Sequence, residues 1–426
     1  MRDIFLYCLN GVEDMVQLAL KGGRPIRDKP FPKWPVFDNR EFEALKKVLE
    51  SGVWGIGGQY VKQLEEKFAA YQHAKYGVAV TSGTTALEIS LRACEIGCGS
   101  EVITTPYTFM ATATAILYVN AIPVFVDIEP DTFNIDPRRI EEAITEKTRA
   151  ILPVHIGGRP ANMDEIMRIA EKHNLRVVED ACQAWGAEWR GRRTGSFGDF
   201  GCFSFQSSKN ITSGEGGITV TSNEELYVKA WSLHNCGRLP QGAWYEHYLP
   251  GVNYRMTEFQ AALLLVQLER LDEHTRRRME NASYLNSKLS KIDGLKPLKD
   301  DERITRHAWH LYIFRYDSEA FGGVSKAGFA EAMKAEGIPV SVGYSKPLYR
   351  EPYLEYFKKC PLSCPYYSSS MDYSKLRLPV AEKACYEEGL WLPQNVLLGS
   401  KEDMDDIIAA FEKVRANADE LGSISK

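Results

Sequence analysis

The sequence of 426 residues lacks an apolar run long enough to cross a membrane, and it lacks an excess of basic residues. Its longest apolar stretch, residues 115–126, is interrupted by Asn120 and Pro123, whereas a membrane span needs about 20 apolar residues. Lys and Arg number 52 against 57 Asp and Glu, which gives a net charge of −5. Because nucleic-acid-binding proteins usually carry a basic excess, we expect neither a nucleic acid nor a membrane among the partners.

Signals for export and for a disulfide framework are also missing. The apolar run Ile4–Leu9 is too short for a signal peptide and follows Asp3. The nine cysteines are odd in number and scattered, so we expect reduced thiols and a cytoplasmic protein. Cys94 and Cys98, like a second pair spaced four apart, have no histidine nearby, and we expect no metal site.

Short apolar segments alternate with helical ones along the first half of the chain. Strands are expected at residues 77–80, 101–105, 123–127, 150–154 and 175–179, followed by shorter ones at 200–205 and 217–221, and helices at 86–94, 111–119, 137–145 and 163–172. Strands that alternate with helices of this length form parallel βαβ units. The pattern predicts an α/β fold with a mostly parallel central sheet.

The remaining segments predict three regions. Residues 1–26 form an N-terminal extension, residues 27–270 a large domain and residues 271–426 a smaller C-terminal α+β domain. A long helix over 258–279 leads out of the large domain. The small domain is expected to contain strands at 308–316 and near 339–342, helices at 326–336 and 402–417, and a long surface loop at 349–373, rich in Tyr, Ser and Pro.

Unusual residues follow several of the expected strands, and ligands bind where parallel strands end. The run Thr81–Leu87, with a glycine and four hydroxyl residues before a helix, is typical of a phosphate cup, although a plain helix cap is the alternative. Asp180 ends a buried strand, where a carboxylate needs a partner. A structural cap or salt bridge is the alternative for Asp180.

Lys209 and Phe109 complete the set. Lys209 lies between two strands and before a glycine-rich turn, where a solvated loop charge is the alternative. Phe109 follows the second strand, where it can cover a flat ring or simply pack in the core. A lysine, a carboxylate, an aromatic ring and a phosphate cup together fit pyridoxal 5'-phosphate (PLP). The lysine would form a Schiff base, and the carboxylate would keep the pyridine nitrogen protonated.

With these residues in place, the chain resembles the PLP-dependent sugar aminotransferases of the DegT/StrS type, which have fold type I. The likeness begins near Gly22 and runs to the terminal helix. It is carried by the motifs Thr81–Leu87, Tyr107–Phe109, Val154–Pro160, Glu179–Ala184, Ser204–Lys209, Gly214–Gly217 and Gly251–Glu258. The resemblance implies a fold type I PLP-dependent transferase, and residues 1–17 lie outside the usual start of the family.

The resemblance assigns roles around the cofactor. Lys209 corresponds to the Schiff-base lysine, which moves a proton as base and then as acid, and Asp180 to the partner of the pyridine nitrogen. Phe109 corresponds to the stacking ring, and Gln183 to a residue near the ring hydroxyl.

Further positions correspond to phosphate ligands. These are Ser204 and the backbone of Thr84 and Thr85. Asn253 corresponds to a residue that reaches a phosphate in the neighbouring subunit, which implies a homodimer with shared active sites.

The substrate end is defined less closely. Arg255 is expected to hold a substrate carboxylate or to form a structural ion pair, and His310 to line the substrate mouth. Many relatives have His where this chain has Tyr349 and where it has Gln183 or Gln206. Both departures are similar to the branch that acts on inososes and related aminocyclitol precursors, often with glutamine as donor, so Tyr349 is a candidate substrate residue.

The implied function is transfer of an amino group from glutamate or glutamine to a keto-sugar or keto-cyclitol, either scyllo-inosose-like or nucleotide-linked. A PLP-dependent sugar dehydratase or other lyase is one alternative. In such dehydratases the Schiff-base lysine is replaced by His, whereas Lys209 is present here. A binding or regulatory protein that keeps the fold without the chemistry is the other alternative.

Overall fold

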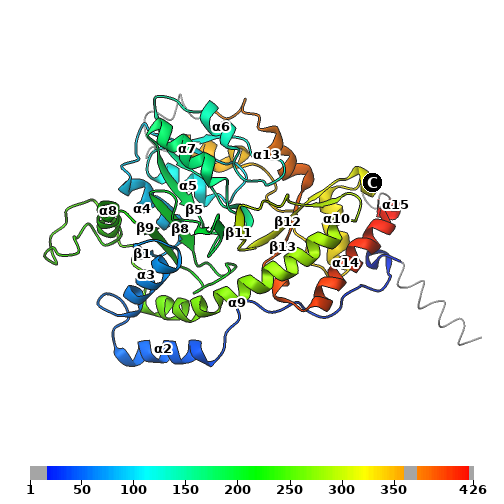
Figure 1. Ribbon diagram of the computed structural model, residues 1–426, viewed down its shortest axis with the longest axis horizontal. Helices are drawn as coiled ribbons and strands as arrows, with labels where there is room; N and C mark the ends of the chain where they lie inside the picture. Colours follow the sequence, from blue (N-terminus) through cyan, green and yellow to red (C-terminus); the bar gives the residue numbers. More distant parts are fainter. Residues whose placement is uncertain (1–16, 359–371, 422–426) are drawn as a thin grey trace, which may run out of the picture.

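A seven-stranded sheet forms the centre of the larger half of the computed structural model, which describes residues 17–358 and 372–421 (Figure 1). In spatial order its strands are β1 (Tyr76–Val80), β9 (Gly217–Thr221), β8 (Phe200–Ser204), β5 (Arg176–Asp180), β4 (Thr148–Leu152), β2 (Glu101–Thr104) and β3 (Ile122–Phe125). Only β9 runs antiparallel to its neighbours. The expected α/β class with a mostly parallel sheet is confirmed.

Helices cover both faces of this sheet, because successive strand residues point to opposite sides. Val102 packs in the core formed with α4 (Gly83–Ala93), α5 (Ala111–Tyr118) and α8 (Glu224–His234). Its neighbour Ile103 packs on the other face. There the covering helices are α3 (Tyr60–Tyr71), α6 (Pro137–Glu142), α7 (Met163–His173) and the first part of α9 (Glu258–Leu289). Helix α2 (Asn39–Ser51) packs against α9.

Helix α9 continues into the smaller half of the molecule (Figure 1), so the expected boundary at residue 270 falls within it. The smaller half contains an antiparallel sheet of β10 (Leu295–Pro297), β12 (Leu311–Tyr316) and β13 (Gly389–Pro393). Helices α10 (Lys326–Ala335) and α14 (Lys401–Ala416) pack against it around a shared apolar core.

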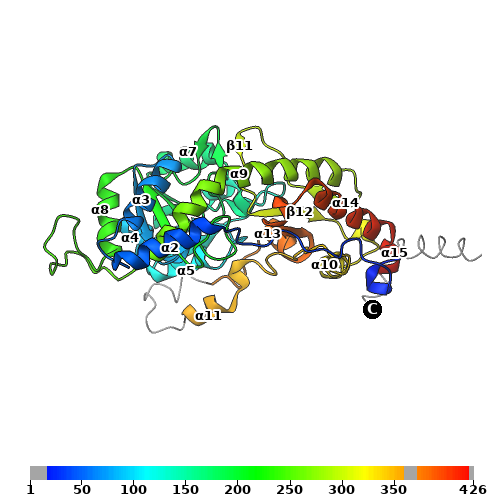
Figure 2. The same cartoon turned by 90° about the horizontal axis from the view of Figure 1, so that it is seen from below.

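Two expectations for the smaller half were wrong. The strand expected near 339–342 is a single bridge between Ser341 and Trp391. The chain turns immediately afterwards at Gly343, whose φ is +68°, a conformation that suits glycine. Part of the loop expected at 349–373 is regular, since α11 spans Pro352–Lys358 and packs near α5 (Figure 2). Residues 359–371 lie outside the described residues.

The N-terminal segment runs along the smaller half. Residues 22–36 are extended, as expected, and Arg27 forms ion pairs with Asp403 (2.8 Å) and Asp406 (2.7 Å). The extension before residue 17 lies outside the described residues. The short elements of the molecule are η1 (Ala19–Lys21), η2 (Ile156–Gly158), β6 (Glu188–Trp189), β7 (Arg192–Arg193), β11 (Ile304–Arg306), η3 (Glu319–Phe321), η4 (Leu348–Arg350), α13 (Pro379–Lys383), the π turn η5 (Ala384–Glu388), η6 (Val396–Leu398) and α15 (Ala418–Leu421).

The structure also bears on membrane-spanning helices and on the state of the cysteines. In the described ranges no helix is both long enough and apolar enough to pass through a bilayer. Cys98 takes part in a disulfide bond, so the expectation of reduced thiols was wrong for this residue. The spacing of cysteines in the sequence does not show which residues the fold brings next to each thiol. The sequence analysis therefore missed this bond.

Candidate active site

A cavity of about 570 Å³ opens at the carboxyl ends of the parallel strands. It is the place where ligands bind in open α/β sheets. Seven of the residues singled out in the sequence line it together: Thr84, Phe109, Asp180, Gln183, Ser204, Lys209 and His310. They come from five separate segments of the chain. The central sheet brings four of these segments to one edge, and the segment with His310 reaches the cavity from the smaller half.

The floor of the cavity at one end is the start of α4. Ser82 caps this helix, accepting a hydrogen bond from the backbone N–H of Thr85 (3.2 Å), while the Thr85 hydroxyl bonds back to Ser82. The first N–H groups of a helix have no partner within it and carry a partial positive charge. A Cβ on Gly83 would lie 2.8 Å from Cβ of Ser204, so this position has room only for glycine. The result is a cup suited to a phosphate.

Asp180 is buried at the end of β5 and is held in one orientation. Its Oδ1 accepts a hydrogen bond from the backbone N–H of Cys182 (3.2 Å), and its Oδ2 accepts one from the hydroxyl of Thr112 (2.8 Å). No basic side chain is paired with this carboxylate in the part of the chain that the structure describes. The carboxylate is therefore available to a cationic group in the cavity, such as a protonated pyridine nitrogen.

Lys209 projects into the same cavity from the loop between β8 and β9. Burial lowers its pKa, because desolvation disfavours the ammonium, while the nearby Cys182 and Asp180 act in the opposite direction. Its Nζ lies 5.9 Å from the ring centre of Trp185. A lowered pKa increases the fraction of free amine, the form that adds to an aldehyde and accepts a proton.

Gln183 is fixed at both ends of its amide. Its Oε1 accepts a hydrogen bond from the backbone N–H of Gly157 (2.7 Å), and its Nε2 donates to the hydroxyl of Tyr344 (3.3 Å). Tyr344 belongs to the smaller half and forms the wall of the cavity together with Trp391. The two rings meet edge to face, with centres 5.1 Å apart.

Phe109 and His310 lie on other sides of the cavity. Phe109 is 59% exposed, an unusual state for a phenylalanine, and therefore offers a free face to a flat ring. His310 is buried, its Nδ1 lies 3.1 Å from Oδ1 of Asn210, and burial and the nearby Lys209 hold its pKa well below the usual value. His310 is thus a neutral side chain in the wall.

Three predicted residues lie away from this cavity. Asn253 is exposed and forms a backbone bridge with Asn235. Arg255 bonds to Oδ1 of Asn235 (3.0 Å) and lines a separate cavity of about 160 Å³. Tyr349 is buried, and its hydroxyl donates to Glu382 (2.7 Å). Within one chain, therefore, none of the three reaches the cavity that holds Lys209.

The sequence reasoning missed Thr112, Tyr344 and Trp391. Thr112 could have been found, because it lies three residues after Phe109 in the segment that the sequence analysis singled out. In the structure its hydroxyl is 3.1 Å from that of Thr108. Tyr344 and Trp391 carry no local signal, since they reach the cavity from the other half of the molecule.

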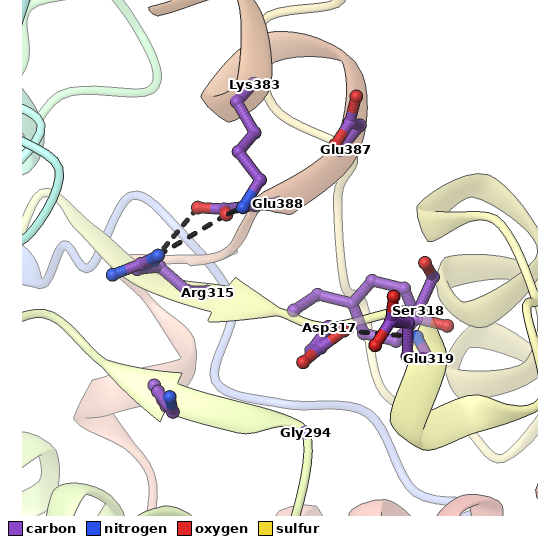
Figure 3. Close-up of a pocket in the computed structure, with 10 residues that line it drawn as sticks. Gly294, Arg315, Asp317, Ser318, Glu319, Lys383, Glu387 and Glu388 are labelled. Atoms are coloured by element: carbon purple, nitrogen blue, oxygen red, sulfur yellow. Dashed lines mark hydrogen bonds and ion pairs between the residues drawn. The ribbon is translucent and has the colours of Figure 1, made fainter. Parts of the chain in front are cut away.

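A second cavity, of about 330 Å³, lies in the smaller half (Figure 3). Its central cations are already neutralised. Arg315 and Lys383 both pair with Glu388, at 2.9 and 2.5 Å. Its lining is mostly charged and includes one aromatic residue, Tyr316. Unlike the first cavity, it lies against the antiparallel sheet of the smaller half and not at the carboxyl ends of the parallel strands.

The first cavity fits PLP. It presents an amine with a lowered pKa, a carboxylate without a basic partner, an exposed aromatic face and a helix start where a glycine is required. These are groups for the aldehyde, the pyridine nitrogen, the ring and the phosphate of this cofactor. Cysteine, histidine and acidic groups that could hold a metal ion are not found together in the described residues.

Comparison with known proteins gives the same result. The model of the DegT/DnrJ/EryC1/StrS aminotransferase family matches residues 35–412. Over 412 residues, the chain is 42% identical to a protein of Streptoalloteichus tenebrarius named "Putative L-glutamine:3-amino-2,3-dideoxy-scyllo-inosose aminotransferase", covering 95% of this chain and 99% of the relative. It is 38% identical to the L-glutamine:2-deoxy-scyllo-inosose aminotransferase of Micromonospora echinospora, covering 96% and 100%.

The fold has close counterparts among solved structures. The crystal structure of 3-amino-5-hydroxybenzoic acid synthase superposes with a TM-score of 0.82 at 33% identity, covering 92% of this chain and 99% of that one. The similarity therefore extends over both halves of the molecule and not only over the central sheet.

Proposed function

The chain belongs to the DegT/DnrJ/EryC1/StrS aminotransferase family, and from that premise we propose that it transfers the amino group of L-glutamine to a keto-cyclitol of the scyllo-inosose type. It is a PLP-dependent aminotransferase. The observation that carries the choice of substrates is the 42% identity, over nearly the full length of both chains, to a relative named for glutamine and an amino-inosose. The resemblance noted at Tyr349 and at Gln183 or Gln206 agrees with the same branch.

Each residue of the cavity has a separate role in the proposed reaction. Bound PLP supplies an electron-accepting ring for the negative charge that develops when the donor loses its α-proton. Lys209 is proposed to accept that proton and to deliver it again, since its lowered pKa favours the free amine. Asp180, oriented by Thr112, would hold the pyridine nitrogen in its protonated state. Phe109 would cover the ring, and the cup at α4 with Ser204 would bind the phosphate.

The test is a visible absorbance spectrum of the purified protein with each donor and acceptor. We expect a yellow band that bleaches with L-glutamine and returns on addition of 2-deoxy-scyllo-inosose or its 3-amino derivative. L-Glutamate in place of glutamine, and a nucleotide-linked keto-sugar in place of the inosose, are the matched comparisons. A band that responds only to glutamate and a nucleotide-linked sugar would overturn the choice of substrates while retaining the reaction.

A homodimer with shared active sites is part of the proposal. Helix α2 and the loop after it expose large apolar side chains, Phe42, Leu49, Trp54 and Ile56, each more than half exposed. Exposed apolar surface of this extent marks an interaction site. Asn253, which lies outside the cavity of its own chain, would then serve the cavity of a second copy.

Subunit complementation tests the shared site. Lys209→Ala and Asn253→Ala homodimers should each have little activity, and their mixed dimers should contain one intact site. Random subunit exchange should restore roughly a quarter of the wild-type activity. A mixture that stays inactive although exchange is complete would exclude a contribution of Asn253 across the interface.

A dehydratase is the second candidate, and product analysis separates the two. Loss of water from a deoxy-keto-sugar without formation of an amine would establish it. We also propose a cytoplasmic location. Five cysteines in the described ranges are free and support it, with the disulfide-bonded Cys98 as the exception: Cys94, Cys182, Cys202, Cys236 and Cys385.

A further inference from the structure

The short π turn Ala384–Glu388 joins α13 to β13 and is held on one side by ion pairs. Glu388 at its end binds Arg315 of β12 (2.9 Å) and Lys383 (2.5 Å), as Figure 3 shows. π turns are rare and occur often at functional sites. The opposite side of the turn has a different partner.

That partner is Lys326, the first residue of α10. Its ammonium donates to the carbonyl oxygens of Val342 (2.9 Å), Cys385 and Gly389 (3.3 Å). The side chain is 8% exposed, and no carboxylate of the described residues forms an ion pair with it. Burial lowers its pKa to about 8. The ammonium of Lys326 thus binds three carbonyls at once and joins segments that are distant in sequence.

Two of those carbonyls lie close to the cofactor cavity. Val342 is two residues before Tyr344, and Gly389 is two residues before Trp391. Both aromatic side chains line the cavity. Between them the packing is tight, because a Cβ on Gly343 would lie 2.9 Å from the Trp391 ring. The separation of the two backbones therefore sets how the two rings meet.

We propose that Lys326 is a positioning residue that fixes the Tyr344–Trp391 wall of the active site and thereby the fit of the substrates. The inference rests on the proposed function only in taking this cavity as the substrate site. Tyr344 in turn accepts the hydrogen bond from Gln183 (3.3 Å), so the position of the wall also affects the orientation of Gln183 on the large-domain side of the cavity.

Lys413 provides a matched control. It is likewise a buried lysine of the smaller half, 7% exposed, and it bonds to the carbonyl of Arg24 (2.7 Å) and to Glu336 (3.0 Å). Its partners do not adjoin the cavity. Lys326→Met and Lys413→Met each remove one buried ammonium. Only the first removes hydrogen bonds to the backbones beside Tyr344 and Trp391, which then stay joined by the bridge between Ser341 and Trp391 alone.

Hydrogen exchange of the full-length protein is the first readout, and it does not depend on turnover. We expect the amides of residues 341–346 and 389–393 to exchange about tenfold faster or more in Lys326→Met, since hydrogen bonds to a charged group are among the stronger ones. In Lys413→Met these amides should exchange as in the wild type. Equal exchange of both segments in the two variants would overturn the proposal.

Kinetics are the second readout. In Lys326→Met, KM should rise about tenfold or more for the substrates, while kcat per bound cofactor stays within about twofold, because the wall shapes binding and does not carry the proton. A purely structural role would leave KM unchanged and lower only the fraction of folded enzyme.

A second variant covers the case in which Lys326→Met fails to fold. Lys326→Gln can still bond one carbonyl, and it should show intermediate exchange and an intermediate KM. Unchanged exchange and an unchanged KM would overturn the inference. Absence of turnover with every inosose would contradict the proposed function and leave the exchange result decisive for Lys326.

Discussion

The hydroxyl of Thr112 donates a 2.8 Å hydrogen bond to Oδ2 of Asp180, and both groups are buried. The bond joins the first turn of α5 to the end of β5, two elements that are 68 residues apart. Its effect is to leave the Asp180 carboxylate with one defined orientation toward the cavity.

Thr112→Val keeps the shape of the side chain and removes this donor. A hydrogen bond to a charged group contributes about 1.5–3 kcal/mol, so we expect kcat to fall about tenfold to a hundredfold while the cofactor remains bound. Thr114→Val is the control, because Thr114 lies in the same helix and bonds only to the carbonyl of Met110. Steady-state kinetics normalised to cofactor content measure the effect, and equal kcat values for the two variants would contradict it.

The phosphate cup at the start of α4 predicts a defect in cofactor binding when Gly83 is replaced. In Gly83→Ala, the new Cβ would lie 2.8 Å from Cβ of Ser204 and 2.9 Å from Sγ of Cys182. Overpacking of this kind costs about 1–3 kcal/mol, and we expect cofactor binding about tenfold weaker. Gly55→Ala, with no atom within 4 Å of the new methyl group, should bind as the wild type does. Titration of the apoenzyme with PLP decides, and unchanged affinity in Gly83→Ala would remove the cup from the site.

Lys209→Ala should separate cofactor binding from turnover. Acid–base catalysis by one group contributes about 10²–10⁴-fold, and we expect activity to fall at least that far. The cofactor should still bind, noncovalently, because the cup and Asp180 are intact. Borohydride reduction should then attach PLP to the wild type and not to the variant. Full activity in Lys209→Ala would contradict the proposed mechanism.

The large half could be predicted from local sequence signals. Residues 217–221 form β9 with the predicted bounds, and residues 77–80 fall within β1. Buried strands between helices produce a pattern that is visible in one sequence, because both faces of such strands are apolar. The same regularity placed Asp180, Phe109 and the cup at one edge of the sheet.

The smaller half follows tertiary contacts that local patterns do not contain. β12 begins at Leu311 and not at 308, since Trp309 has a φ of +50° and breaks the extended backbone. β13 follows a π turn to which Lys326 donates a hydrogen bond, and nothing near Gly389 in the sequence indicates this contact. The contributions of Tyr344 and Trp391 to the site were missed for the same reason.

A half-buried acid outside the active site predicts how stability depends on pH. Glu65 of α3 accepts a hydrogen bond from the backbone N–H of Ala79 (2.9 Å), and burial raises its pKa to about 8, with Glu66 and Glu258 acting in the same direction. In the unfolded chain the pKa returns to its usual value near 4.5. The folded state therefore binds one more proton than the unfolded state between these two values.

It follows that the contribution of Glu65 to stability is complete below about pH 4.5 and is lost as the pH rises to about 8. Glu65→Gln keeps an oxygen for the N–H of Ala79 and cannot ionise. We expect Tm of this variant to fall less than that of the wild type between pH 5 and pH 8, and to exceed it at pH 8. Glu66→Gln removes the same charge from an exposed neighbour, 65% exposed, and should retain most of the wild-type slope. Calorimetry at both pH values measures the difference, and parallel curves for Glu65→Gln and the wild type would show that Glu65 ionises in the folded protein as it does in the unfolded chain.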